Sequence, residues 1–181
     1  ASLLQDRRVA RFFATSEEMV APLGASGRPS RALPLAFTIS ADPVERPDGS
    51  PPVVSFFCSP SEYRRKNALA CLLALSGLDV PYVLHVNGLA ARAEYRTFLE
   101  ELKIPHRDLG WMDDETYARA LDEVDLGLQV SLADSFNYVA AEHFARSIPV
   151  VVSPSVPCAH GLTKDVARLL VVADPDSPSA I

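Results

Sequence analysis

The sequence lacks the features that mark membrane-spanning, secreted or zinc-binding proteins. Its longest uninterrupted apolar run, Ala68–Leu75, is far shorter than the roughly 18 residues that a bilayer crossing needs. No signal-peptide pattern of charged, apolar and small residues is recognisable. The cysteines are odd in number and show no C-x-x-C spacing, which argues against a disulfide framework or zinc knuckle: Cys58, Cys71 and Cys158. We therefore expect no membrane span and a cytoplasmic location.

An excess of basic residues is also missing. The chain has 23 acidic residues and 17 basic ones, which gives a formal net charge of -6, whereas nucleic-acid-binding surfaces usually carry a basic excess. We therefore expect no nucleic-acid partner. Any anionic ligand must bind to a local basic cluster.

Several catalytic and cofactor-binding motifs are absent. The sequence contains no G-x-S-x-G, no Walker lysine and no G-x-G-x-x-G, which disfavours hydrolase, NTPase and dinucleotide-dependent oxidoreductase functions. The four histidines show no metal-ligand spacing: His85, His106, His143 and His160. We expect no metal site and no cofactor.

Short β-type runs alternate with helical stretches of roughly ten to fifteen residues from Pro81 onward, a pattern typical of βαβ units on a parallel sheet. The predicted strands are Val53–Cys58, Tyr82–Val86, Arg107–Gly110, Asp125–Val130, Pro149–Val152 and Leu169–Val172. The predicted helices lie near Arg64–Ser76, Ala91–Leu102, Asp113–Glu123, Asn137–Ser147 and Thr163–Ala167. Because the strands are apolar on successive residues, we expect helices on both faces. The prediction is an α/β fold with an open, doubly wound, Rossmann-like parallel sheet.

The start of the chain has a different organisation. It predicts a strand, a helix capped by Ser16 and a second strand: Val9–Thr15, Ser16–Leu23 and Ala32–Thr38. The proline-rich segment 41–52 that follows predicts a domain boundary. About forty residues cannot build a core of their own. We expect residues 1–44 to be a remnant of a preceding domain with its linker, and residues 45–181 to be the main domain, truncated at its C-terminal end.

A basic turn follows the first strand of the predicted sheet. Arg64, Arg65 and Lys66 stand at the start of a predicted helix, where the helix dipole favours negative charge. A phosphate bound by the helix amides and by Arg65 or Lys66 would remove this conflict. The alternative is a basic turn that is simply solvated.

Two acids with seven residues between them follow the fourth strand. Asp134 is predicted in a loop and Glu142 in the next helix, with Ser135 and Asn137 able to cap that helix. Since each carboxylate offers two acceptor oxygens, such a pair can bind vicinal hydroxyls. The alternative makes Asp134 a helix cap and Glu142 a surface acid.

Two more strand ends carry candidate binding residues. In Asn87-Gly88, the glycine either lets a ligand approach the backbone or simply adopts a positive φ. Trp111, which precedes Met112, either stacks on a base or packs in the core or at its edge.

Taken in order, these segments resemble the C-terminal, donor-binding domain of retaining GT-B glycosyltransferases of the group 1, family four-like type. The resemblance rests on Arg65–Asn67, Gly110–Met112, Asp125–Ser131, Asp134–Glu142 and Ile148–Ser153, and Phe13–Glu18 resembles the end of the preceding acceptor domain. The sequence departs from the pattern at Asp134, where Glu is usual, at Ser135, where glycine is usual, and at Ser147-Ile148, where glycine is common.

The resemblance implies a role for each candidate residue. Glu142 would bind the nucleotide ribose, Asp134 would face the sugar hydroxyls, and Arg65 and Lys66 would neutralise the diphosphate leaving group. The backbone around Ser135, Phe136 and Asn137 would lie near the phosphates. Asn87, Gly88, Trp111 and Met112 would complete the nucleotide site. No metal is required by this scheme.

The resemblance also implies a function. The chain would be the donor half of a retaining glycosyltransferase that transfers a hexosyl unit from a UDP-, GDP- or similar nucleotide-sugar. The carbohydrate or other acceptor would bind mainly to the missing domain, so this chain alone would be inactive. The alternative is a catalytically inactive GT-B-like binding or scaffold module that acts with a partner chain. A nucleotide-sugar epimerase is disfavoured, because no extra acid or histidine is placed for that reaction.

Overall fold

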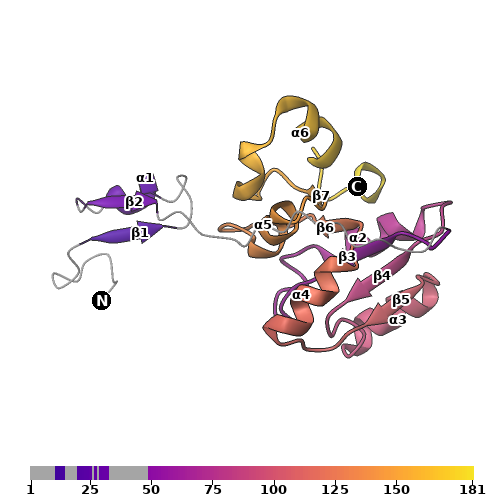
Figure 1. Cartoon of the computed structure of the whole chain (residues 1–181). Helices are drawn as coiled ribbons and strands as arrows, with labels where there is room; N and C mark the ends of the chain where they lie inside the picture. The colour runs from indigo at the N-terminus through magenta and orange to yellow at the C-terminus, as the bar shows by residue number, and fades with distance from the viewer. Residues whose placement is uncertain (1–10, 15–19, 26, 28, 33–48) are drawn as a thin grey trace.

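A five-stranded parallel sheet forms the centre of the larger part of the protein. The computed structural model describes residues 11–14, 20–25, 27, 29–32 and 49–181 (Figure 1). The strands follow the order β5-β4-β3-β6-β7, and every neighbouring pair is parallel. They are β3 (Val53–Phe56), β4 (Val83–Val86), β5 (His106–Asp108), β6 (Leu126–Gln129) and β7 (Val150–Val152).

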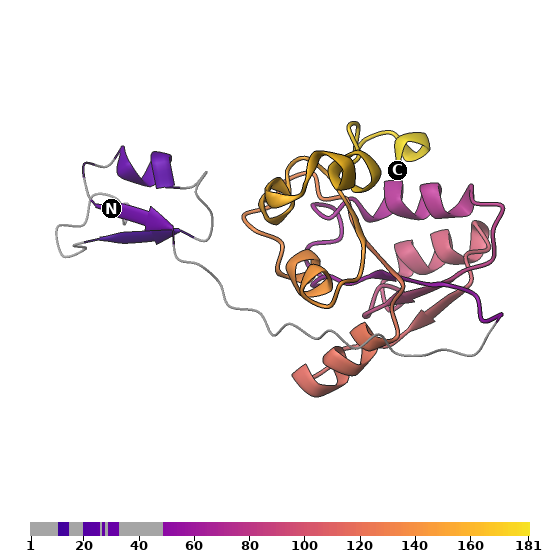
Figure 2. The same ribbon diagram turned by 45° about the horizontal axis from the view of Figure 1, so that its top comes forward.

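Helices cover both faces of this sheet, which confirms the predicted doubly wound fold. In Figure 2, α2 (Ala68–Ser76) and α3 (Ala93–Glu101) lie on one side of the sheet and α4 (Asp114–Asp122) lies on the other. The remaining elements are α5 (Tyr138–Ala145), η3 (Pro157–Gly161), α6 (Lys164–Leu170) and η4 (Pro178–Ala180). No helix among the described residues combines the length and the apolar character needed to cross a bilayer.

Strand β3 is buried on both faces, and its side chains alternate between two cores. Val54 and Phe56 belong to the cluster that includes residues of α2 and α3. Val53 and the following Phe57 belong to a second cluster that includes residues of α4. Phe56 and Phe57 are each only 1% exposed, and a fully buried Phe contributes about 1.5–3 kcal/mol through removal from water. The continuous apolar run at Val53–Cys58 therefore reflects burial on both faces.

Helix α5 is held against the sheet by a buried histidine. His143 is fully buried, and its Nε2 lies 2.7 Å from the Ser55 hydroxyl oxygen of β3. Its Nδ1 lies 2.7 Å from the carbonyl oxygen of Val139. The ring also fits against Gly127, where an added Cβ would lie 2.8 Å from His143 Cδ2. These contacts fix the position of the helix that carries Glu142.

The strand order reverses between β3 and β6. The chain runs from β3 outward through β4 to β5, then returns to the other side of β3 to form β6 and β7. In open parallel sheets the loops that follow the two strands at such a reversal diverge, and ligands bind in the crevice beyond the carboxyl ends of the strands. The loops that follow β3 and β6 are therefore the first place to look for a site.

One predicted strand is wrong. Leu169 and Leu170 belong to α6, and only Val171 forms an isolated bridge, with Val152 of β7. The Thr163 side chain caps this helix by accepting from the amide of Val166 at 3.5 Å, and the helix then continues through Leu170. The hydrophobic residues at this end are therefore helical, because periodicity in so short an apolar run does not distinguish a strand from a helix.

The predicted helix from Arg64 begins only at Ala68. Asn67 adopts a left-handed backbone with φ 58°, so the preceding residues form turns. Helices α3, α4 and α5 lie within their predicted ranges, and α6 extends three residues beyond its range. The 3-10 helices η3 and η4 were not among the predicted helices.

The described N-terminal residues form a strand, a helix and a strand in the predicted order, but the second strand begins at Ser30 and not at Ala32. The elements are β1 (Phe12–Ala14), α1 (Val20–Gly24) and β2 (Ser30–Ala32). The two strands are parallel, with Phe12 opposite Ser30. Ser16 and residues 33–48, which include most of the predicted second strand and of the proline-rich boundary, lie outside the described residues. The domain division at residue 44 stays a prediction.

Candidate functional site

The loops that follow β3 and β6 meet at the carboxyl edge of the sheet. The amide of Leu132 donates to the carbonyl oxygen of Arg65 at 2.9 Å. The Arg65 guanidinium donates from Nη1 to the carbonyl oxygen of Ala133 at 2.5 Å. Two segments that are 68 residues apart in sequence are thus joined at the point where the strand order reverses.

The loops bring Arg65, Lys66 and Asp134 together; we call these three residues the switch-point cluster. Lys66 Nζ lies 2.7 Å from Asp134 Oδ2, and the side chains are only 6% and 5% exposed. Arg65 Nη1 lies 3.3 Å from the same oxygen. Burial alone would raise the pKa of Asp134, but the bonds and charges supplied by Lys66, Ser131 and Arg65 lower it below its ordinary value. Lys66 is therefore a buried, paired cation, and the solvated-turn alternative is wrong for it.

Hydroxyl groups from the segments that follow β6 and β7 form a hydrogen-bond network around Asp134. The Ser131 hydroxyl donates to Asp134 Oδ2 at 3.1 Å. The hydroxyls of Ser153 and Ser155, which follow β7, both donate to the carbonyl oxygen of Ser131. Asn137 Nδ2 also donates to the Ser131 hydroxyl at 3.4 Å. Ser131 was not among the predicted site residues, although it ends the segment Asp125–Ser131 on which the family resemblance partly rests.

Asn137 caps α5, so the alternative that makes Asp134 the cap is wrong. Asn137 has φ 68°, and its Oδ1 accepts from the amide of Ala140 at 3.1 Å. Asp134 Oδ1 instead accepts from the amide of Phe136 at 3.4 Å. Ser135 is exposed, and the half-buried Phe136 makes an edge contact with Tyr138, with 5.5 Å between the ring centroids.

Glu142 is half-buried and bonded to α4, so it is not an ordinary surface acid. Tyr117 donates its hydroxyl to Glu142 Oε2 at 2.7 Å. Burial, together with the nearby carboxylate, raises the pKa of Tyr117 well above its ordinary value, so its hydroxyl stays a donor. The ion pairs of Asp134 are with the turn before α2, and the side-chain hydrogen bond of Glu142 is with α4. The two acids are thus anchored to different elements. Tyr117 had no sequence signal of its own.

Asn87 and Gly88 are tied into the fold. Asn87 Oδ1 accepts from the amide of Cys58 at 2.9 Å, which joins the ends of β3 and β4. Asp108 accepts from the amides of Gly88, at 2.6 Å, and Gly110, at 2.9 Å. Gly88 has φ 83°, a backbone conformation that favours glycine. The turn therefore has a structural role, and Asp108, which sequence reasoning missed, holds it.

Trp111 and Met112 follow the edge strand β5. Trp111 is 82% exposed, so the alternative that packs it in the core or at its edge is wrong. Met112 is half-buried against the cluster of α4 and lines a cavity of about 430 Å³ together with Leu109 and Thr116. Since β4 lies between β5 and β3, these residues are not in the switch-point cluster. No group of three or more potential metal ligands occurs within the part of the chain that the structure describes.

No protein-family model matches the sequence, and no curated protein matches it. Several solved structures do match. HepE (Alr3699) from Anabaena, in complex with UDP and glucose, has a TM-score of 0.73 at 16% identity, over 95% of this chain and 51% of HepE. Sucrose-phosphate synthase from Thermosynechococcus elongatus has a TM-score of 0.71 at 19% identity, over 94% and 46%. WaaG, a glycosyltransferase involved in lipopolysaccharide biosynthesis, has a TM-score of 0.70 at 16% identity, over 96% and 52%.

These structures are GT-B glycosyltransferases, and the likeness shows that the chain has their Rossmann-like fold. At identities of 16–19% the likeness establishes the fold alone. The chain spans about half the length of each of the three.

Proposed function

Starting from this GT-B fold, we propose that the chain is the donor-binding part of a retaining glycosyltransferase. It would bind a nucleotide-sugar, whose hexosyl unit passes to an acceptor held mainly by another domain. The observation that carries the proposal is the switch-point cluster, since it places two cations and a carboxylate where an open parallel sheet binds ligands. Structures of HepE have been solved in complex with UDP and glucose and in complex with UDP-glucose.

The cations suit a diphosphate. Arg65 and Lys66 can donate charge-assisted hydrogen bonds to phosphate oxygens. They would also neutralise the charge that grows on the leaving diphosphate in the transition state, where electrostatic stabilisation lowers a barrier most. The Arg65 side chain is 36% exposed and Lys66 is buried against Asp134. A diphosphate would therefore contact Arg65 first and compete with Asp134 for Lys66.

Each acid keeps an oxygen with spare accepting capacity. Asp134 uses Oδ2 for Lys66, Arg65 and Ser131, while Oδ1 makes only the 3.4 Å contact with the Phe136 amide. Glu142 uses Oε2 for Tyr117. A sugar hydroxyl at Asp134 and the ribose at Glu142 would use the remaining capacity. The backbone of Ser135 to Asn137, the Asn87-Gly88 turn, Met112 and the exposed indole of Trp111 complete the proposed nucleotide site.

Calorimetric titration with UDP, GDP and uridine tests the diphosphate assignment. Arg65→Ala should weaken UDP or GDP binding about tenfold or more, because a hydrogen bond to a charged group contributes about 1.5–3 kcal/mol. Uridine binding should change much less. Lys66→Met serves as the second variant, and Arg168→Ala, on exposed α6, is the matched control. Equal losses for nucleotide and nucleoside would contradict the assignment.

A second titration tests Glu142. Glu142→Gln should weaken nucleotide binding roughly ten- to a hundredfold while the melting temperature stays near that of the unmodified chain. Tyr117→Phe is the control for the α4 contact, because it removes the partner hydroxyl and leaves the carboxylate in place. Unchanged affinity in Glu142→Gln would remove this residue from the site.

A transfer assay separates the enzyme from the alternative. We expect no sugar transfer by the 181-residue chain alone and activity once an acceptor domain is supplied. Robust transfer by the chain alone would contradict the proposal that the acceptor is held mainly by another domain. Failure of every nucleotide and nucleotide-sugar to bind would favour the scaffold module that acts with a partner chain. The cytoplasmic location expected from the cysteines stays a prediction; all three are free thiols in the structure.

A further inference from the structure

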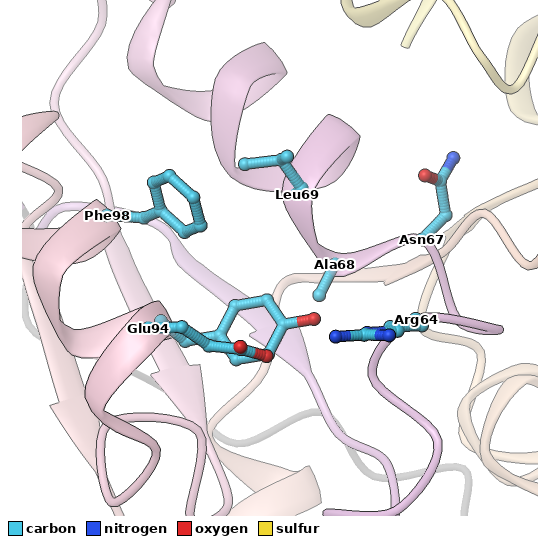
Figure 3. Close-up of a pocket in the computed structure, with 7 residues that line it drawn as sticks. Arg64, Asn67, Ala68, Leu69, Glu94 and Phe98 are labelled. Atoms are coloured by element: carbon cyan, nitrogen blue, oxygen red, sulfur yellow. The ribbon is translucent and has the colours of Figure 1, made fainter.

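A second pocket lies between α2 and α3 (Figure 3), and two of its lining residues, Arg64 and Asn67, flank Arg65 and Lys66 of the switch-point cluster. Its volume is about 300 Å³, at the small end of the range for ligand sites. The residues that line it are Arg64, Asn67, Ala68, Leu69, Glu94, Tyr95 and Phe98. Arg65, Lys66, Asp134 and Glu142 of the proposed donor site are not among them.

The pocket is lined by a buried tyrosine whose hydroxyl has no hydrogen-bond partner among the described residues. Tyr95 is only 5% exposed, and among the described residues its hydroxyl makes no hydrogen bond. The other two tyrosines in the buried core do make one: Tyr63 donates to the Asn87 carbonyl oxygen and Tyr82 to that of Leu75. Buried tyrosine hydroxyls usually find a partner. Burial raises the pKa of Tyr95, so the hydroxyl keeps its proton and can donate into the pocket.

Opposite charges face each other across the pocket without pairing. Figure 3 shows Arg64, from the turn before α2, and Glu94, from α3, pointing toward each other, while Asn67 points away. Neither charged side chain forms an ion pair with another described residue, whereas the neighbouring Arg65 and Lys66 do. Helix α2 also begins here without a side-chain cap and without an acid in its first turn. The Arg64 side of the pocket thus favours an anion, and the Glu94 side favours a cation.

One wall of the pocket is apolar. Leu69 is 41% exposed and Phe98 is half-buried, and both lie on the same side of the close-up view. A simple anion would be repelled by Glu94. A neutral hydroxylated ring would leave both charges without a charged partner. A small zwitterion with an apolar side chain matches all three surfaces.

We propose that the α2–α3 pocket binds a free α-amino acid with an apolar side chain. The carboxylate would lie near the start of α2, where it would bind Arg64 and the hydroxyl of Tyr95 from α3. The ammonium would bind Glu94, and the side chain would pack on Leu69 and Phe98. The proposed ligand uses none of Arg65, Lys66, Asp134 and Glu142, so its test needs no nucleotide.

Titration of the full chain with L-leucine and L-phenylalanine, by calorimetry and by amide NMR, tests this proposal. Three analogues dissect recognition. N-acetyl-L-leucine lacks the ammonium, L-leucinamide lacks the carboxylate, and glycine lacks the apolar side chain. Each should bind at least about tenfold more weakly than leucine, because each loses one of the three contacts. The amides of Leu69 and Phe98 should shift on binding.

Variants locate the site. Tyr95→Phe removes one hydroxyl and should weaken leucine binding about tenfold without lowering the melting temperature. Arg64→Gln should weaken it at least as much, and Arg96→Gln, an exposed α3 arginine outside the pocket, should leave it unchanged. The proposal is wrong if neither amino acid binds at millimolar concentration, or if binding is insensitive to Tyr95→Phe and Arg64→Gln. It is also wrong if D-glucose binds here and the amino acids do not.

Discussion

Acid should destabilise the fold by protonating the buried His143, which holds helix α5 against the sheet. In the folded chain its Nδ1 donates to the Val139 carbonyl oxygen, and Nε2 accepts from the Ser55 hydroxyl, so the ring is neutral. Burial is the main reason that the pKa of His143 falls from 6.5 to about 4, and the charge of Arg146 lowers it further. A proton on Nε2 would turn this acceptor into a donor, so the Ser55 hydroxyl could no longer donate its hydrogen bond to Nε2. The folded state therefore resists protonation that the unfolded chain accepts.

The size and sign of the effect follow from the two pKa values. The unfolded chain binds the proton below about pH 6.5, and the folded chain binds it only below about pH 4. The contribution to stability is thus fully present above pH 6.5 and is lost as pH falls toward 4. Between about pH 7.5 and about pH 4.5, protonation of His143 should lower the free energy of unfolding by about 2–3 kcal/mol, since one pKa unit corresponds to about 1.4 kcal/mol.

Urea unfolding at both pH values measures this loss. Carboxylates also titrate in this range, so the readout is the difference between variants. His143→Gln, which does not titrate, should show a pH dependence smaller by about 2–3 kcal/mol than the unmodified chain. His160→Gln, at an exposed position in η3, should behave like the unmodified chain. The double variant Ser55→Ala with His143→Leu is a second non-titrating comparison. An unchanged pH dependence in both His143 variants would refute the reasoning.

Three further predictions concern the packing around the proposed site. Asp134→Ala should cost about 3–5 kcal/mol by urea unfolding, because it leaves Lys66 charged and buried; Lys66→Met should cost less, since Asp134 keeps other donors, and the reverse order would be evidence against the pairing. Gly127→Ala should cost about 1–3 kcal/mol in a thermal melt, because the new Cβ meets the buried His143 ring and Val150. Tyr117→Phe should cost about 1 kcal/mol by urea unfolding, since it removes the hydrogen bond to the half-buried Glu142 carboxylate. No measurable loss in the last variant would show that the bond contributes nothing net.

The sheet could be predicted because the composition of its strands reflects the burial of their faces. Val53–Cys58 is apolar at successive positions, and the structure buries both of its faces. Helix ends were harder, because single residues decide them. Asn67, with φ 58°, precedes an α2 that begins four residues later than predicted, and Thr163 caps a helix that extends to Leu170, into the wrongly predicted strand Leu169–Val172. Neither effect changes the average hydrophobicity or the period that a sequence pattern reports.

The components of the proposed site could be predicted, but their pairing could not. The basic turn and the two acids are visible as local patterns on either side of a strand. The ion pair between Lys66 and Asp134 depends on β3 and β6 being neighbours, which the order of elements along the chain does not fix. The contact of Tyr117 with Glu142 likewise depends on how α4 and α5 pack. Long-range contacts of this kind leave no periodic signal.

The pairing changes what a diphosphate would have to do in order to bind. Lys66 and Asp134 already satisfy each other in a buried environment, so a phosphate that bonds to Lys66 must replace a 2.7 Å contact and offset the loss to Asp134. Arg65 is more exposed and shares its charge with Glu62, also partly exposed, at 2.5 Å. Displacing a partly exposed carboxylate costs less than separating a buried pair. For the donor site proposed above, Arg65 should therefore contribute more net binding free energy than Lys66, and Arg65→Ala should weaken nucleoside diphosphate binding more than Lys66→Met. The opposite order would mean that the buried ion pair opens readily.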